Sequence, residues 1–246
     1  MPKYRIADLL IEIEARYELT KSTCRDYLVE TDEVPDFSIA VSEEEIAATH
    51  AGLADCSLAY AENYAIFRKI ATEAAERGAV LLHAAVIEVD GCAYAFSAPS
   101  GTGKSTHILL WRKRLGKRVD IINGDKPFLR IKDGVLTVYG SPFSGKEGWQ
   151  RNASAPLKGL CFLFRAEENS IERLMDERTI MPRVFAQMLK TPSEKGISET
   201  LRCADTLIKD VPIYTLGCNI SLEAAEIAFR AMTGLDLPPL PDAETI

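Results

Sequence analysis

The feature that most constrains this chain is a glycine-containing loop between an expected strand and an expected helix. Residues 98–106 read Ala-Pro-Ser-Gly-Thr-Gly-Lys-Ser-Thr. They match the phosphate-binding pattern at Gly103, Lys104 and Ser105, with Ala98 where the usual pattern begins with glycine. Glycines let backbone N–H groups turn toward phosphate oxygens, the lysine reaches the outer phosphates, and the serine hydroxyl binds magnesium.

The segments before this loop fit a strand that enters it. Residues 79–89 form a β-rich run, Asp90-Gly91 is a typical pair for a tight hairpin turn, and residues 92–97 form the return strand. A strand before the loop and a helix after it form the context that confirms the motif. We therefore expect a nucleotide to contact Ser100, Gly101, Thr102, Gly103, Lys104, Ser105 and Thr106, with Lys104 at the loop surface.

The segments after the loop add a candidate acid. Residues 107–115 are expected to form a helix that ends at Gly116, and residues 118–122 form a buried strand followed by Asn123-Gly124-Asp125. A phosphate-transferring site of this type needs an acid from another strand to position magnesium, and Asp125 is that candidate. The alternative is that Asp125 is a turn residue, because turns favour this composition.

The rest of the chain indicates an α/β fold with a mixed β-sheet. We expect a small α+β N-terminal extension over residues 1–77, the loop-containing domain over 78–235, and a loosely held, proline-rich tail over 236–246. The expected strands are residues 4–13, 36–41, 128–131, 135–139, 160–164 and 212–216, with an Asp133-Gly134 turn between the third and fourth. One helix is expected after an N-cap at Ser42 and another over about residues 57–77. Two more are expected between 177 and 209, and a last one is expected to be capped by Ser221.

Composition excludes several classes of protein. The formal net charge is −7, which disfavours a nucleic-acid partner; the cationic group at residues 112–118 is typical of a helix end. The six cysteines form no CxxC pair and no metal-like spacing with the three histidines, so we expect reduced, mostly buried thiols of a cytoplasmic protein. No apolar run approaches the ~20 residues needed to cross a bilayer, and the first residues are not a signal peptide.

Several motifs together resemble those of a known family. Leu82-His83-Ala84 before the hairpin, the loop at 97–106, and the acid after the next strand resemble HPr kinase/phosphorylase and the related phosphoenolpyruvate carboxykinases. The blocks at residues 122–127 and 139–148 look like those of short bacterial HPr-kinase-like proteins. The resemblance is good over about 78–165 and weak elsewhere. It implies a P-loop domain of this family's type and transfer of a phosphoryl group from ATP, with Mg²⁺, to a serine hydroxyl. Homo-oligomers also occur in the family.

The chain departs from the family at the expected second acid. HPr kinases have two adjacent acids after the strand, whereas this chain has Gly124-Asp125-Lys126. Either Asp125 serves as base and metal ligand, or another residue supplies the base. The family has a histidine near the transferred phosphate, which makes His83 the second candidate; its position in an alternating strand with Leu81, Ala85 and Ile87 equally fits a half-buried histidine without chemistry. We expect His107 to pack rather than react.

A second loop adds candidate ligands. Residues 141–149 combine glycines, a lysine, an acid and two aromatics between β-rich segments. Lys146 and Lys126 are candidates for contacting phosphate or substrate, and Glu147 is a candidate magnesium ligand with Ser105 and Asp125. The alternative is a solvated turn over Trp149.

Two functions therefore remain in competition. The first is an ATP- and Mg²⁺-dependent kinase that phosphorylates a hydroxyl, with serine in a peptide, protein or small molecule as the acceptor, through Lys104, His83 and Asp125. The second is a nucleotide-binding regulatory or scaffold protein that has lost transfer chemistry, a reading motivated by Gly124. No nucleic-acid or membrane partner is expected.

Overall fold

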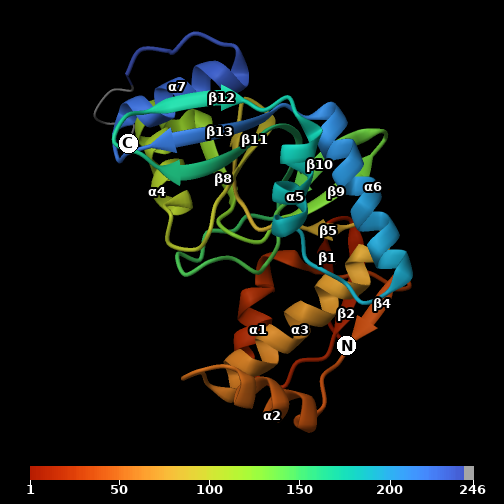
Figure 1. Ribbon diagram of the computed structural model, residues 1–246. Coiled ribbons are helices and arrows are strands. Elements are labelled where there is room, and N and C mark those ends of the chain that lie inside the picture. Colours follow the sequence, from red (N-terminus) through yellow and green to blue (C-terminus); the bar gives the residue numbers. More distant parts are fainter. Residues whose placement is uncertain (241–246) are drawn as a thin grey trace.

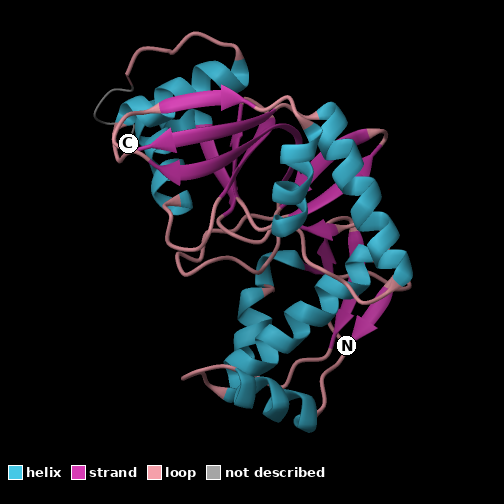
Figure 2. Ribbon diagram, viewed as in Figure 1, coloured by secondary structure: helices cyan, strands magenta, loops and turns pink. Residues whose placement is uncertain are grey.

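The computed structural model describes residues 1–240, which form an α/β fold with two β-sheets and seven α-helices (Figures 1 and 2). The helices are α1 (Glu18–Thr23), α2 (Glu43–Gly52), α3 (Leu58–Ala75), α4 (Lys104–Leu115), α5 (Glu177–Gln187), α6 (Glu194–Asp210) and α7 (Leu222–Thr233). Short 3-10 turns cover Arg25–Tyr27 and Gly116–Arg118. Within residues 1–240, none of the helices has the length and apolar character needed to cross a membrane.

The smaller sheet belongs to the N-terminal part of the chain. Its strand order is β3-β1-β2-β4, from β1 (Lys3–Ile6), β2 (Leu9–Ile13), β3 (Leu28–Val29) and β4 (Phe37–Ile39). The helix after it begins as expected, because the Ser42 side chain accepts from the Glu45 backbone N–H and the Glu45 side chain accepts from the Ser42 N–H. Helix α3 begins after Ser57, whose side chain caps it.

The larger sheet is mixed and curled. Its main path is β5-β9-β10-β11-β7-β6-β8, and β13 joins β11 with β12 outside it. Strands β7, β11 and β13 run parallel, so their carboxyl ends lie at one edge. The strands are β5 (Val80–Leu81), β6 (Ala85–Val89), β7 (Cys92–Ser97), β8 (Val119–Asn123), β9 (Phe128–Lys132), β10 (Val135–Tyr139), β11 (Ser154–Arg165), β12 (Ser170–Arg173) and β13 (Ile213–Cys218).

Helices cover both faces of this sheet (Figure 2). Helices α4 and α7 pack on one face around Trp111 and Phe229, both of which are fully buried. Helices α5 and α6 pack on the other face through residues such as Val184 and Leu207. The fold is therefore layered, and the loop between β7 and α4 lies where parallel strands end.

Both predicted Asp-Gly turns are confirmed. Asp90 and Gly91 have φ angles of 51° and 77°, and Asp133 and Gly134 have φ angles of 50° and 78°. Two consecutive positive φ angles give the turn twist that matches antiparallel strands, and glycine adopts them at low cost. The turns join β6 to β7 and β9 to β10.

Several predicted elements are wrong in extent. The run 4–13 is two strands, because Ala7 and Asp8 turn the chain with φ angles of 51° and 60°. The run 79–89 is also divided, and His83 lies in the gap between β5 and β6. Helix α4 begins at Lys104 rather than 107, β11 is longer than expected, and α1, β3 and β12 were not predicted.

The start of the proline-rich tail is held rather than loose. Arg114 Nη2 donates to the Pro238 carbonyl at 2.9 Å, and Leu237 packs against the α4–α7 side of the core. The remaining part of the predicted tail, residues 241–246, lies outside the described residues. All six cysteines are free thiols, but only Cys24, Cys161 and Cys203 are buried, so the expectation of mostly buried thiols is half right.

Candidate nucleotide-binding site

The glycine loop has the backbone conformation that its sequence demands. Gly101 and Gly103 have φ angles of 79° and 125°, and an added Cβ at either would meet nothing within 4 Å. Conformation rather than space therefore requires glycine here. Arg165 Nη2 from the end of β11 donates to the Gly101 carbonyl at 2.6 Å and helps to fix the loop. Helix α4 begins directly after the loop at Lys104, and the N-cap residue Gly103 has no side chain to cap the first backbone N–H groups of the helix.

The loop borders a cavity of about 600 Å³. Because helix N-termini carry free backbone N–H groups and partial positive charge, they favour phosphate in such a cavity. The loop residues 99–101 and 103–106 line it, together with 124–126 after β8, 144–147 from the second loop, and Tyr60 from α3. The predicted contacts Ser100, Gly101, Gly103, Lys104, Ser105 and Thr106 are thus brought to one cavity, as are Asp125, Lys126, Lys146 and Glu147; Thr102 does not line it.

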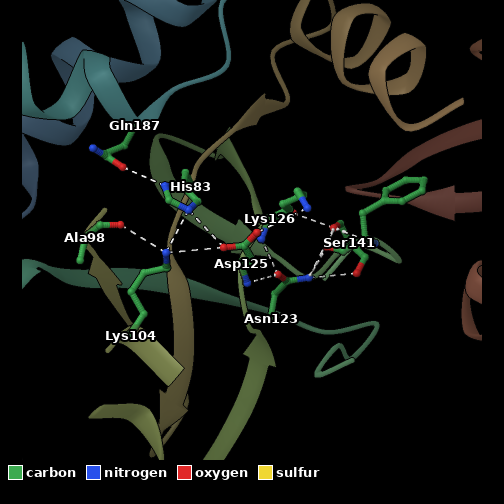
Figure 3. Close-up of polar contacts among 9 residues, drawn as sticks. His83, Ala98, Lys104, Asn123, Asp125, Lys126, Ser141 and Gln187 are labelled. Atoms are coloured by element: carbon green, nitrogen blue, oxygen red, sulfur yellow. Dashed lines mark hydrogen bonds and ion pairs between the residues drawn. The ribbon is translucent and has the colours of Figure 1, made fainter. Parts of the chain in front are cut away.

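Lys104 lies deeper than its sequence position indicated. Its side chain is 9% exposed, so the expectation of a lysine at the loop surface is wrong. The ammonium contacts His83 Nε2 at 2.9 Å, the Ala98 carbonyl at 3.3 Å and Asp125 Oδ1 at 3.6 Å (Figure 3). Burial lowers the pKa of Lys104, although the charges of Asp125 and Glu147 oppose that shift.

His83 projects from the interruption between β5 and β6. The expected strand face shared with Leu81, Ala85 and Ile87 is wrong, because the chain leaves the strand geometry here. Its Nδ1 lies 3.1 Å from Gln187 Oε1, and its backbone N–H donates to the Gln187 carbonyl at 2.8 Å. Its Nε2 faces Lys104 and lies 3.2 Å from Asp125 Oδ1. With its side chain 38% exposed, His83 is held at both ends yet accessible.

Asp125 receives three cationic or polar partners. Besides His83 and Lys104, Lys126 Nζ lies 3.4 Å from its Oδ2. Burial alone would raise the pKa of Asp125, but the His83 hydrogen bond and the charges of Lys126, His83 and Lys104 lower it to about 2. The carboxylate is therefore ionised throughout the neutral range.

Asn123 holds this turn in place. Its Oδ1 accepts from the backbone N–H groups of Asp125 and Lys126 at 2.9 and 2.7 Å. Its Nδ2 donates to the carbonyls of Ser141 and Phe143 at 3.0 and 3.2 Å. The amide thus ties the turn after β8 to the second loop, which explains how two distant segments share one cavity.

The candidate magnesium ligands fit the chemistry of that ion. Ser105, Asp125 and Glu147 line the same cavity, and the two acids flank Gly145: an added Cβ there would lie 3.1 Å from Glu147 Oε2 and 3.4 Å from Asp125 Cβ. Hydroxyl and carboxylate oxygens suit Mg²⁺, which keeps several waters and takes few protein ligands. Over residues 1–240 no group of three or more His, Cys, Asp or Glu side chains could hold a metal by itself.

Gly124 stands where the sequence resemblance led us to expect another acid. Its N–H donates to the Trp149 carbonyl at 2.9 Å, and an added Cβ would lie 3.5 Å from that oxygen. A side chain here would thus begin against Trp149. His107, by contrast, is 2% exposed and accepts from Trp111 Nε1 at 3.0 Å, which confirms its packing role.

Sequence reasoning missed four residues of the site. Gln187, Asn123, Arg165 and Tyr60 contact or line it, yet none belongs to the loop motif. Gln187 is 104 positions from His83. Of these four residues, only Asn123 could have been suspected from the sequence, because it is a polar residue two positions before the candidate acid.

Comparisons with known proteins add a distant structural likeness. No protein-family model matches the chain, and no curated protein matches its sequence. Among solved structures, the Hpr(Ser) kinase/phosphatase from Coxiella burnetii is similar at 11% identity and a TM-score of 0.37, covering 63% of this chain and 93% of that one. At these values the likeness establishes no family, and the functional assignment rests on the geometry of the site.

Proposed function

We propose that this chain is an ATP- and Mg²⁺-dependent phosphotransferase that phosphorylates a hydroxyl group, with serine as the first candidate acceptor. The observation that carries the proposal is the convergence of Lys104, His83 and Asp125 beside the glycine loop of a 600 Å³ cavity. Phosphoryl transfer depends mainly on positioning and charge neutralisation, and this set supplies both. A P-loop domain of the HPr-kinase type is the fold assignment that belongs to this proposal.

The chain's own residues have separable tasks in this reaction. Backbone N–H groups of the loop hold the phosphates, and Lys104 exchanges its contacts with His83 and Asp125 for the outer phosphate oxygens. Bound magnesium neutralises phosphate charge, with Ser105, Asp125 and Glu147 as the residues that would hold it. His83 is not among these three residues, so its imidazole stays available for proton transfer.

His83 is the proton acceptor in this scheme. Because Gln187 Oε1 accepts from Nδ1–H, a neutral His83 ring carries its lone pair on Nε2 and no longer donates to Asp125. The Nε2 atom loses its Lys104 contact when the lysine turns to phosphate. The acceptor oxygen then forms its bond to the γ-phosphorus, the bond to the β-phosphate bridging oxygen breaks, and the hydroxyl proton passes to Nε2.

A second candidate function is a nucleotide-binding regulatory protein without transfer chemistry. Gly124 favours it, because the family's second acid is absent. A loose transition state tolerates a missing base, so Gly124 does not by itself remove activity.

Single-turnover incubation with γ-labelled ATP and a panel of hydroxyl acceptors separates the two functions. We expect transfer or slow hydrolysis by the parent and none by Lys104→Met, with Lys113→Met, an exposed lysine on the same helix, as control. Since each hydrogen bond to a charged group contributes ~1.5–3 kcal/mol, Lys104→Met should also weaken ATP binding at least about tenfold. Tight ATP binding without any loss of γ-phosphate would favour the regulatory protein.

A further inference from the structure

A second cavity adjoins the start of the glycine loop. It has a volume of about 530 Å³ and is bounded by the end of β7 and the loop start, one face of α5, the carboxyl-terminal part of β11, and Thr215 of β13. Pro182, Arg183, Ala186 and Gln187 supply the α5 face, as expected for residues one turn apart on a helix. Ligands of α/β proteins commonly bind where parallel strands end, which is the position of this cleft.

One end of this cleft adjoins the candidate catalytic residues. Pro99 lines both cavities, and Ala98, which lines the cleft, accepts from Lys104 Nζ at 3.3 Å. Gln187 lines the cleft and contacts His83 Nδ1 (Figure 3). A group at this end of the cleft therefore lies next to Lys104 and His83.

The cleft offers apolar surface and one cation. Phe164 is 49% exposed, and its ring lies over Gly217, where an added Cβ would be 2.8 Å from Phe164 Cζ. Arg183 is exposed and forms no ion pair with any acid in residues 1–240. The hydroxyls of Ser97 and Thr215 already donate to the carbonyls of His83 and Phe162.

We infer that this cleft binds the phosphoryl acceptor, and that the acceptor is an extended peptide segment with an apolar and an acidic side chain beside its serine or threonine. This inference rests on the proposed function. A small polar substrate needs several convergent polar groups, which this lining lacks, whereas a peptide buries apolar surface and pairs its acid with Arg183.

The helix geometry fixes the spacing of the motif. Arg183 and Gln187 are one turn apart, which corresponds to ~6 Å along α5. An extended chain advances ~3.3 Å per residue, so the acid belongs about two residues from the phosphorylated hydroxyl. The preference should occur on one side of the serine only, because Arg183 lies on one side of Gln187.

The test uses serine peptides in one alanine–leucine frame, with Glu, Gln or Lys at the second residue on either side. Transfer from labelled ATP gives kcat/KM, and anisotropy of dye-labelled peptides with alanine in place of serine gives binding in the presence of ADP and Mg²⁺. The variants are Arg183→Glu and, as control, Arg178→Glu, an exposed arginine of α5 that does not line the cleft. Nucleotide binding is followed separately by thermal shift with ATP and Mg²⁺.

We expect the parent to prefer the peptide with Glu on one side of the serine. Arg183→Glu should change the ratio of kcat/KM for the Glu peptide to kcat/KM for the Lys peptide by at least tenfold in favour of Lys. Arg178→Glu should keep the parent preference, and the ATP thermal shift should be the same in all three proteins. The inference is overturned if no peptide binds, if only free small hydroxy compounds are phosphorylated, or if Arg183→Glu leaves the preference intact. Peptide binding that Arg183→Glu reverses, without any transfer, would support the cleft while contradicting the proposed phosphotransferase.

Discussion

At the residue scale, the proposed reaction gives proton transfer to one residue and metal binding to another. His83 is half-buried and lies 3.2 Å from Asp125, whereas Asp125 is held among three cationic or polar partners. A carboxylate with a pKa of about 2 is a weak proton acceptor at neutral pH but a good ligand for a cation. The proposed reaction therefore assigns the cation to Asp125 and the proton to His83.

Substitution of the two residues should have different kinetic effects. We predict that His83→Ala lowers the transfer rate by about 10²- to 10⁴-fold, the usual contribution of a general base, while ATP affinity changes little. Asp125→Asn should weaken Mg²⁺-dependent ATP binding as well as the rate. Single-turnover rates and ATP titrations of both variants make the comparison. Full transfer by a folded His83→Ala protein would assign the proton to Asp125.

Gln187 should act as a positioning residue for His83. We predict that Gln187→Leu lets both neutral tautomers of His83 populate, because Nδ1–H loses its acceptor while the His83 backbone N–H keeps the Gln187 carbonyl. ¹⁵N chemical shifts of the labelled imidazole report the tautomer with a non-hydrolysable ATP analogue and Mg²⁺ bound, the state in which the proposed reaction turns Lys104 away from Nε2. Gln187→Glu retains an acceptor and serves as the control that should keep the Nδ1–H form. Identical tautomer shifts in parent and Gln187→Leu would remove this role.

At the element scale, α4 carries a buried imidazole that should make the fold sensitive to acid. Burial lowers the pKa of His107 to about 3, and its Nδ1 has no hydrogen-bond partner in the described structure. The folded protein therefore keeps His107 neutral, whereas an unfolded chain binds a proton below pH ~6.5. Stability is lost as pH falls from about 6.5 toward 3, by up to ~1.4 kcal/mol per pH unit.

We predict that His107→Gln is less stable than the parent at pH 8 but loses less free energy of unfolding between pH 6.5 and 4. Glutamine retains an acceptor for Trp111 Nε1 and does not titrate. Urea unfolding followed by tryptophan fluorescence at several pH values measures the difference. His50→Gln provides the control, because His50 lies outside this core and its Nε2 donates to the Cys56 carbonyl at 2.9 Å. Parallel pH curves for parent and His107→Gln would contradict the prediction.

Local chemistry accounts for the elements that the sequence predicted well. The Asp-Gly turns, the Ser42 cap and the glycine loop are each determined by residues within a few positions. Ser221, also expected as a cap, precedes α7 but makes no side-chain cap hydrogen bond. The break at His83 is different, because it depends on partners from elsewhere: the Leu82 N–H donates to the Pro127 carbonyl and Leu82 bridges Met188. Neither partner is visible in the alternating pattern of residues 79–89. Gln187 and the burial of Lys104 could not be predicted for the same reason, because both depend on contacts between residues far apart in the sequence.

At the scale of the whole molecule, the N-terminal part is packed against the loop-containing part (Figure 1). Phe67 of α3 contacts Phe143 of the second loop with ring centroids 4.8 Å apart. Asp8 accepts from the Tyr139 hydroxyl at 2.7 Å and pairs with Lys132 at 2.8 Å. This continuous core places α3 beside the candidate nucleotide cavity, where Tyr60 is 48% exposed.

Tyr60 should therefore bind the base or ribose end of the nucleotide, opposite the phosphate-binding end at Lys104. We predict that Tyr60→Leu weakens ATP binding by about 5- to 150-fold, because stacking of a base on an aromatic ring is worth ~1–3 kcal/mol. Binding of inorganic tripolyphosphate with Mg²⁺ should be unchanged, since that ligand has no base. Isothermal titration with both ligands makes the measurement.

A matched variant shows whether the effect belongs to Tyr60 rather than to α3 as a whole. Leu58→Ala removes an exposed apolar side chain from the same helix outside the cavity lining and should leave both affinities at the parent values. Equal losses for ATP and tripolyphosphate in Tyr60→Leu would mean that the substitution disturbs the phosphate end through the shared core. An unchanged ATP affinity would place the base elsewhere. A selective loss for ATP would make the N-terminal part a component of the nucleotide site, because Tyr60 comes from α3 and Lys104 from α4.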